Sequence, residues 1–253
     1  IVLSAGRLTK QKNFTYLINE FENFFRFNRN FILVILGDGE DRKLLENTVL
    51  LGPKEVNSGS CSSIGVESII NIWRKEELLK VTIHELFHAL CYDEYDDTYD
   101  IIEEYQKRYE ITSDKVNTRE AYTEIWANIL NCFLISQMSN KDNYKCFKRM
   151  INLEKEFSFF QANKILYMID SYKDINEKTN ILAYFVIRAE LYKNFKKFII
   201  FCKNHNKRYV KVNGKKFISF LKKNEIISKK EKSKKLLNTC RLSANEFKLF
   251  TDE

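Results

Sequence analysis

The sequence predicts a mainly α-helical protein with a short β-sheet, preceded by a small segment of alternating strands and helices. From residue 118 onward, apolar residues recur at helical spacing in four segments, which cover residues 119–138, 143–169, 178–202 and 214–223. The first 47 residues instead alternate apolar, strand-like runs with amphipathic stretches. With 253 residues, 44% of them hydrophobic, the chain is long and apolar enough to bury a core.

The N-terminal 47 residues have the pattern of a βαβα unit. Ile1 to Ala5 and Phe31 to Leu36 are apolar runs typical of buried strands, and Phe14 to Phe27 is an amphipathic helix. Gly37-Asp38-Gly39 marks a turn before the second helix. We interpret residues 1–47 as a partial Rossmann-like fragment. Two parallel strands with their helices cannot cover both faces of a sheet, so this fragment needs further strands from elsewhere.

A change of composition over residues 48–65 predicts a domain boundary. This stretch contains the only proline, Pro53, and the polar run at residues 57–60. Beyond it, Glu67 to Trp73 has the pattern of a short strand, and Arg74 to Cys91 that of a helix. We therefore expect two domains, residues 1–47 and residues 48–253.

The helix predicted over residues 74–91 carries a His-Glu-x-x-His motif, formed by His84, Glu85 and His88. Residues four apart on a helix share one face, so both imidazoles can bind one cation, with Glu85 beside them. A zinc ion held in this way lowers the pKa of its bound water to about 7, and a carboxylate can take the proton during hydrolysis. The motif predicts a zinc-dependent peptidase with His84 and His88 as ligands and Glu85 as the general base.

A catalytic zinc needs a third protein ligand. His205, the remaining histidine, lies more than a hundred residues further on and is a poor candidate. The helix predicted over residues 119–138 offers carboxylates on successive turns, at Glu120 and Glu124. We favour Glu124, and Glu120 or the carboxylates of residues 93–97 are the alternatives.

These motifs resemble those of the gluzincin metallopeptidases, in which a second helix supplies a glutamate after the His-Glu-x-x-His helix. The resemblance covers about residues 48–253, and implies a zincin-like core with His84, His88 and Glu124 as zinc ligands and Glu85 as base. It also implies that Ile69 to Trp73 is the edge strand on which a substrate peptide lies. The motif regions at residues 73–77, 84–88 and 121–127 look like those of uncharacterised giant DNA virus proteins. The chain departs from the thermolysin-like pattern at Asn128, where those enzymes place a carboxylate one turn after the ligand.

Residues 4–13 and 36–42 resemble the donor half of GT-B glycosyltransferases of family 4. The resemblance implies that Arg7 and Lys12 hold the diphosphate of a nucleotide sugar. After Glu46 the family's pattern stops, without an acceptor-binding half or further strands. We therefore expect residues 1–47 to be a remnant of such a domain.

The function that the sequence favours is hydrolysis of a peptide or protein substrate, with Zn²⁺ as the cofactor. One alternative is a non-catalytic protein of zincin-like fold that has a structural or partner-binding role. The other is a remnant of a nucleotide-sugar glycosyltransferase. The intact Glu85 favours the enzyme, because a purely structural zinc site does not need a base.

Charge and cysteine usage bear on partners and compartment. Residues 193–235 contain sixteen Lys or Arg and only two carboxylates, whereas residues 93–104 contain seven carboxylates and no base. The basic segment could bind nucleic acid, but we favour a solvated face. Six scattered cysteines without a Cys-x-x-Cys pair indicate reduced thiols inside a cell, in a host cytoplasm or a virion if the protein is viral. No apolar run is long enough to cross a membrane. The chain begins with Ile1, so we expect its natural N-terminus to be missing and its targeting to be unknown.

Overall fold

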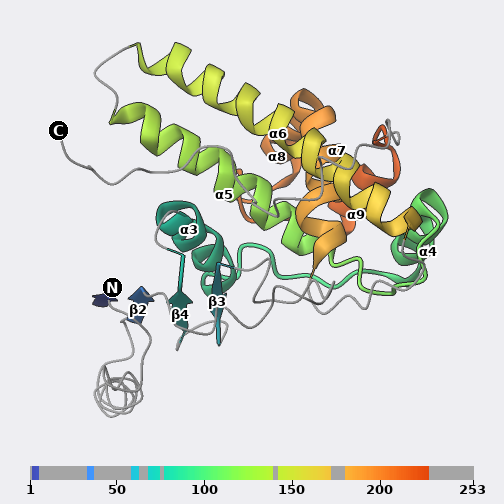
Figure 1. Cartoon of the computed structure of the whole chain (residues 1–253), viewed down its shortest axis with the longest axis horizontal. Helices are drawn as coiled ribbons and strands as arrows, with labels where there is room; N and C mark the ends of the chain where they lie inside the picture. Colours follow the sequence, from blue (N-terminus) through green and yellow to red (C-terminus); the bar gives the residue numbers. More distant parts are fainter. Residues whose placement is uncertain are drawn as a thin grey trace. The chain divides into compact units, whose positions relative to one another are not determined.

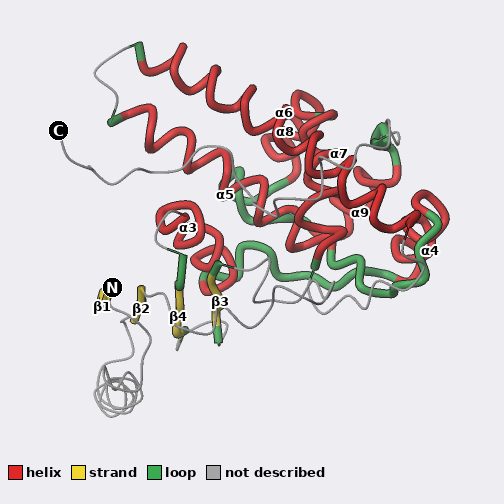
Figure 2. The backbone as a smooth tube through the Cα atoms, viewed as in Figure 1, coloured by secondary structure: helices red, strands yellow, loops and turns green. Residues whose placement is uncertain are grey.

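The computed structural model describes residues 2–5, 33–36, 58–62, 68–74, 77–138, 142–171 and 180–227. For residues 2–5, 33–36 and 167–171 it describes the backbone alone. The chain forms two compact units, of which the first contains the described residues up to Cys91 and the second those from Tyr92 onward. Figures 1 and 2 show a small sheet in the first unit and a set of helices in the second. The prediction of a mainly α-helical protein is confirmed.

The first unit contains a four-stranded sheet of order β1-β2-β4-β3. Its strands are β1 (Val2–Ala5), β2 (Leu33–Leu36), β3 (Gly59–Cys61) and β4 (Ile69–Ile72). The β1–β2 and β2–β4 pairs are parallel, and β3 runs antiparallel to β4. The expectation that residues 69–73 form an edge strand is wrong, because β4 pairs with β2 on one side and β3 on the other. The short strand β3, which the sequence does not predict, lies at the edge.

The strands of the N-terminal fragment belong to the same sheet as β3 and β4. Leu36 of β2 is in register with Ile72 of β4, so β4 supplies a neighbour that two isolated parallel strands lack. The predicted domain boundary between residues 47 and 48 stays a prediction. Among the described residues, the two compact units divide after Cys91.

Helix α3 (Leu78–Ala89) packs on β3 and β4. Ile70 and Ile72 alternate along β4 with less buried residues, as expected for a strand with one face covered. They meet Val81 and Ala89 of α3 in a buried apolar cluster. The helix is shorter than the predicted range 74–91, but it contains the whole His-Glu-x-x-His motif.

The second unit is helical. Its elements are α4 (Tyr99–Tyr109), α5 (Thr118–Gln137), α6 (Asn143–Ser171), the π-helix η4 (Leu182–Ile187), α7 (Arg188–Lys193), α8 (Phe195–His205) and α9 (Gly214–Lys222). The helices α5 and α6 lie side by side and antiparallel, and η4 and α7 pack against both (Figure 1). The segment predicted as one helix over residues 178–202 is divided into a π-helix and two α-helices, with a turn at Asn194.

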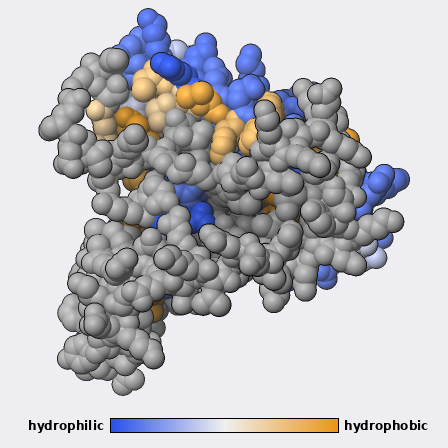
Figure 3. Space-filling view, in the orientation of Figure 1, coloured by the Kyte–Doolittle hydropathy of each residue, from blue (hydrophilic) through white to orange (hydrophobic). Residues whose placement is uncertain are grey.

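The outer surfaces of α5 and α6 combine apolar and charged side chains. Large apolar side chains that are exposed on these two helices include Phe133, Leu134, Leu153 and Phe160. Figure 3 shows apolar residues, in orange, beside hydrophilic residues, in blue, on the face that it presents. Scattered exposure of this kind is common on helices and does not by itself indicate a function.

Helix α4 is an element that the sequence pattern did not predict. Its segment overlaps the acidic run of residues 93–104, whose charge suggests a solvated loop. The structure buries Ile101, Tyr105 and Tyr109, which follow one another at intervals of four residues. This periodicity is the signal that identifies the helix, because such positions share one face.

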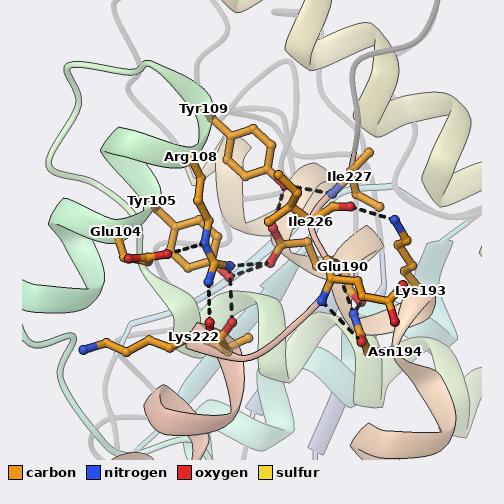
Figure 4. Close-up of polar contacts among 12 residues, drawn as sticks. Glu104, Tyr105, Arg108, Tyr109, Glu190, Lys193, Asn194, Lys222, Ile226 and Ile227 are labelled. Atoms are coloured by element: carbon orange, nitrogen blue, oxygen red, sulfur yellow. Dashed lines mark hydrogen bonds and ion pairs between the residues drawn. The ribbon is translucent and has the colours of Figure 1, made fainter.

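A buried hydrogen-bond network joins α4, α7 and the end of α9 (Figure 4). The carboxylate of Glu190 accepts hydrogen bonds from the hydroxyls of Tyr105, at 2.7 Å, and Tyr109, at 2.5 Å. The Arg108 guanidinium lies 3.7 Å from the same carboxylate and donates to the backbone carbonyls of Leu221 and Lys222. The network therefore holds three helices that are far apart in the sequence.

The described residues contain neither a membrane-spanning helix nor a disulfide. In the part of the chain that the structure describes, no helix has the length and apolar character needed to cross a membrane. Within the same ranges no disulfide joins the cysteines, whose described members are Cys61, Cys91, Cys132, Cys146 and Cys202.

Candidate metal centre

Helix α3 brings its two histidines together on one face. The Nε2 atoms of His84 and His88 lie 3.1 Å apart, and the ring planes are inclined at 75°. Two ligands of a tetrahedral zinc ion, each about 2.05 Å from the metal, would be roughly 3.3 Å apart. The distance between the two nitrogens is therefore close to the distance that a shared zinc ion requires.

Glu85 lies next to His84 and is almost completely buried, with 6% of its surface exposed. Gly59 of the edge strand β3 is its close neighbour. A Cβ atom added to Gly59 would lie 3.2 Å from Oε1 of Glu85 and only 2.5 Å from Val81. Because glycine has no side chain, β3 can pass directly alongside the carboxylate that the motif identifies as the general base.

The two candidate glutamates of α5, in the second unit, have different partners there. Glu124 is fully buried, and its Oε1 accepts a hydrogen bond of 2.8 Å from Nη1 of Arg188, which is also fully buried. Glu120 is 7% exposed, and its Oε2 accepts a hydrogen bond of 3.0 Å from the hydroxyl of Tyr184. An arginine thus balances the charge of Glu124, whereas the tyrosine that donates to Glu120 is neutral.

Among the described residues, His84, His88 and Glu120 are the set of three His, Cys, Asp or Glu side chains that could hold a metal ion. Glu124, which the sequence favours, is not part of this set. Its assignment as a ligand stays a prediction, and the buried ion pair with Arg188 counts against it. The sequence favours Glu124 over Glu120. The two glutamates lie one helical turn apart, so their spacing alone does not decide between them.

Two of the other candidate ligands, Asp93 and Asp97, contact residues of α5. Asp97 accepts hydrogen bonds from the backbone N–H, at 2.9 Å, and the hydroxyl of Thr118, which is the first residue of α5. Asp93 accepts a hydrogen bond of 3.0 Å from the hydroxyl of Thr123. These carboxylates hold the start of α5, where a negative charge also favours the helix dipole. His205 is exposed at the end of α8, and Arg7 and Lys12 lie outside the described residues.

A short chain of hydrogen bonds holds Glu120 in place. Tyr184 projects from the π-helix and donates to Glu120, and its own oxygen accepts from Asn180 at 3.4 Å. Asn117 in turn donates to Asn180 at 3.0 Å. Burial and the neighbouring Glu120 carboxylate raise the pKa of Tyr184 well above its ordinary value, so the hydroxyl remains a donor. Sequence reasoning missed Tyr184, which is 64 residues from Glu120 and belongs to no recognisable motif.

The donor set of two imidazole nitrogens and one carboxylate oxygen is one that catalytic zinc commonly takes. The neighbouring base and the buried surroundings are also typical of a catalytic zinc site. In comparisons with known proteins, no family model, curated protein or solved structure matches the chain.

Proposed function

We propose that the protein is a zinc-dependent peptidase in which His84, His88 and Glu120 bind the metal and Glu85 is the general base. The observation that carries the proposal is the pair of imidazole nitrogens 3.1 Å apart on α3, with the buried Glu85 between the two histidines in sequence. A buried carboxylate next to two convergent imidazoles suits a base that works on metal-bound water.

Glu120 fits the role of third ligand better than Glu124. It belongs to the set of residues that could hold a metal ion, and the hydroxyl of Tyr184 that donates to it carries no charge. The residue one turn after Glu120 is Glu124, so a carboxylate follows the ligand by one turn, as in the thermolysin-like pattern. With Glu124 as ligand, that place would be taken by Asn128.

The bound metal, Glu85 and β3 then have separate roles in hydrolysis. Zinc supplies a water of lowered pKa and polarises the scissile carbonyl when it is bound. Glu85 accepts the proton of the attacking water at its carboxylate and returns it to the leaving amine nitrogen. The edge strand β3, which passes beside Glu85, offers backbone groups to an extended peptide, and this role replaces the one expected for β4. The proposed substrate is therefore an unfolded or extended peptide segment.

The test is the variant Glu85→Gln, assayed for zinc content and for cleavage of a peptide library. We expect stoichiometric zinc, an unchanged fold and a cleavage rate lower by about 10²- to 10⁴-fold, because only the basicity of the side chain is lost. Glu156→Gln makes the same change at an exposed carboxylate of α6 and should cleave like the wild type. If Glu85→Gln cleaves as fast as the wild type, or if the wild type takes up no zinc, the proposal is wrong.

A further inference from the structure

The loop between α8 and α9 and the helix turns beside it form a basic surface whose own residues include no carboxylate. Residues 193–223 contain eleven Lys or Arg and no Asp or Glu. Three of the eleven, Lys193, Lys197 and Lys222, contact groups outside this stretch. Six others gather around the loop, and none of them pairs with a carboxylate among the described residues. These six define the basic loop surface: Lys203, Lys207, Arg208, Lys211, Lys215 and Lys216.

This concentration of charge is unfavourable in the isolated protein. Neighbouring cations within a Debye length of about 8 Å repel one another. Lys215 and Lys216 lie in the first turn of α9, where the helix dipole disfavours positive charge. Nζ of Lys216 lies 3.3 Å from Nδ1 of His205, so the end of α8 and the start of α9 are close together. An anionic partner would relieve both unfavourable contributions.

The loop is held in one conformation by bonds to the rest of the second unit. Lys207 and Lys211 exchange two backbone hydrogen bonds, of 3.1 and 3.0 Å. The hydroxyl of Tyr122, a buried residue of α5, donates to the carbonyl of Val210 at 2.7 Å. The backbone N–H of Val212 donates to the carbonyl of Tyr92 at 2.8 Å. The cations are therefore displayed by a fixed backbone, which lowers the entropy cost of binding.

The tip of this loop has an unusual backbone and an exposed aromatic ring. Arg208 and Tyr209 have positive φ angles of 53° and 66°, which residues other than glycine adopt at a cost. Tyr209 nevertheless leaves 60% of its surface exposed, so the strained backbone gains no burial of the ring. The positive φ angles belong to the tight turn that the Lys207–Lys211 hydrogen bonds close, and this turn presents the ring to solvent.

We propose that the basic loop surface binds single-stranded nucleic acid, with phosphates contacting the cations and a base stacking on Tyr209. The cations account for backbone binding, and the exposed ring next to Arg208 is what an unstacked base requires. A duplex keeps its bases stacked and would make no use of the ring. The proposal is independent of the metal chemistry, because it uses none of the residues of the candidate metal centre.

The experiment is fluorescence anisotropy of the full chain with a labelled single-stranded oligonucleotide of about 12 nucleotides, at several salt concentrations. The double variant Lys207→Gln/Arg208→Asn should bind more weakly. The slope of log K against log salt should be about 1.4 smaller, because each cation removed leaves one phosphate without its partner and lowers the slope by roughly 0.7. Asparagine is used at 208 because it tolerates a positive φ. Tyr209→Asn should lower affinity roughly 5- to 100-fold and leave the slope unchanged.

Matched controls lie on α6, away from the loop in sequence. Lys148→Gln/Arg149→Gln removes the same charge, and Tyr144→Asn removes a ring that is 73% exposed. Both controls should bind like the wild type. The proposal is overturned if the controls weaken binding as much as the loop variants do, or if the wild type shows no salt-dependent binding. Binding to vesicles that contain anionic lipid, without binding to the oligonucleotide, would also overturn it.

Discussion

Glu120 and Glu124 lie one helical turn apart on α5, and their buried partners give them different roles. Glu124→Gln would remove the charge that faces Arg188, and breaking a buried ion pair typically costs about 3–5 kcal/mol. We expect this variant to unfold at a much lower denaturant concentration and to keep zinc while it is folded. Chemical denaturation and metal analysis of the same sample measure both quantities.

The matched change Glu120→Gln should have the opposite result. It removes a proposed ligand and leaves the ion pair of Glu124 with Arg188 intact, so stability without metal should change less than in Glu124→Gln. Zinc affinity should fall by more than the roughly 10- to 100-fold that is typical of losing a group outside the ligand sphere. Should Glu124→Gln lose zinc while Glu120→Gln retains it, the third ligand is Glu124, as the sequence favours.

Tyr184 is predicted to orient Glu120 toward the metal. Tyr184→Phe removes only the hydroxyl that donates to Glu120, and we expect zinc affinity to fall about 10- to 100-fold without loss of fold. Tyr192→Phe is the control, because it removes an equally buried hydroxyl whose neighbour is Asn128 and not Glu120. Competition with a chelator of known affinity measures both variants. Equal zinc affinities for the two variants would remove Tyr184 from the site.

The elements that could be predicted from the sequence are those whose apolar spacing is regular. Helices α5, α6 and α9 are close to their predicted ranges, because their buried residues recur at helical intervals over many turns. The three-residue strand β3 is too short for such a pattern, and it is stabilised by pairing with β4. At the break, the side-chain amide of Asn194 donates to the backbone carbonyls of Glu190 and Glu225, and no local pattern reveals the contact with Glu225.

The network around Glu190 should make the packing of α4, α7 and α9 depend on pH. Burial raises the pKa of Glu190 from 4.5 to about 7, against the opposing effects of the Tyr109 and Tyr105 hydroxyls, Arg108 and Lys193. The folded state therefore holds the proton more tightly than the unfolded state, and this contribution to stability is lost as pH rises from about 4.5 to about 7. The loss should be about 3 kcal/mol, at 1.36 kcal/mol for each pKa unit.

Denaturant unfolding of Glu190→Gln at pH 5 and pH 8 tests this prediction. Glutamine cannot ionise, so the variant should lose less stability than the wild type between the two pH values. Glu225→Gln, at an exposed carboxylate paired with Lys197, should keep the wild-type pH dependence. If Glu190→Gln and the wild type have the same pH dependence, Glu190 does not titrate in this range.

For the whole molecule, the sequence predicts the local part of the candidate site and not the long-range part. His84 and His88 are four residues apart on one helix, with Glu85 next to His84. The local motif is therefore enough to predict that the two histidines share a face. The choice between Glu120 and Glu124 depends on Tyr184 and Arg188, each 64 residues further along the chain than its partner. Such pairings follow from how helices pack, and single-sequence patterns do not contain that information.

The sheet topology changes the role expected for the N-terminal segment. The sequence suggests that residues 1–47 are a separate remnant, but β2 pairs along β4, and β4 supports α3 with its two histidines. Deleting residues 1–47 would leave β4 with an exposed edge and with β3 as its one partner in the described sheet. We expect the first unit of the truncated chain to unfold at a lower temperature and to bind zinc more weakly.

The helices of the second unit should be unaffected, since none of the described strands belongs to that unit. Hydrogen exchange can follow the two units separately: protection should decrease in α3 and stay constant in α5 and α6. Unchanged protection of α3 and unchanged zinc affinity would show that the segment is dispensable.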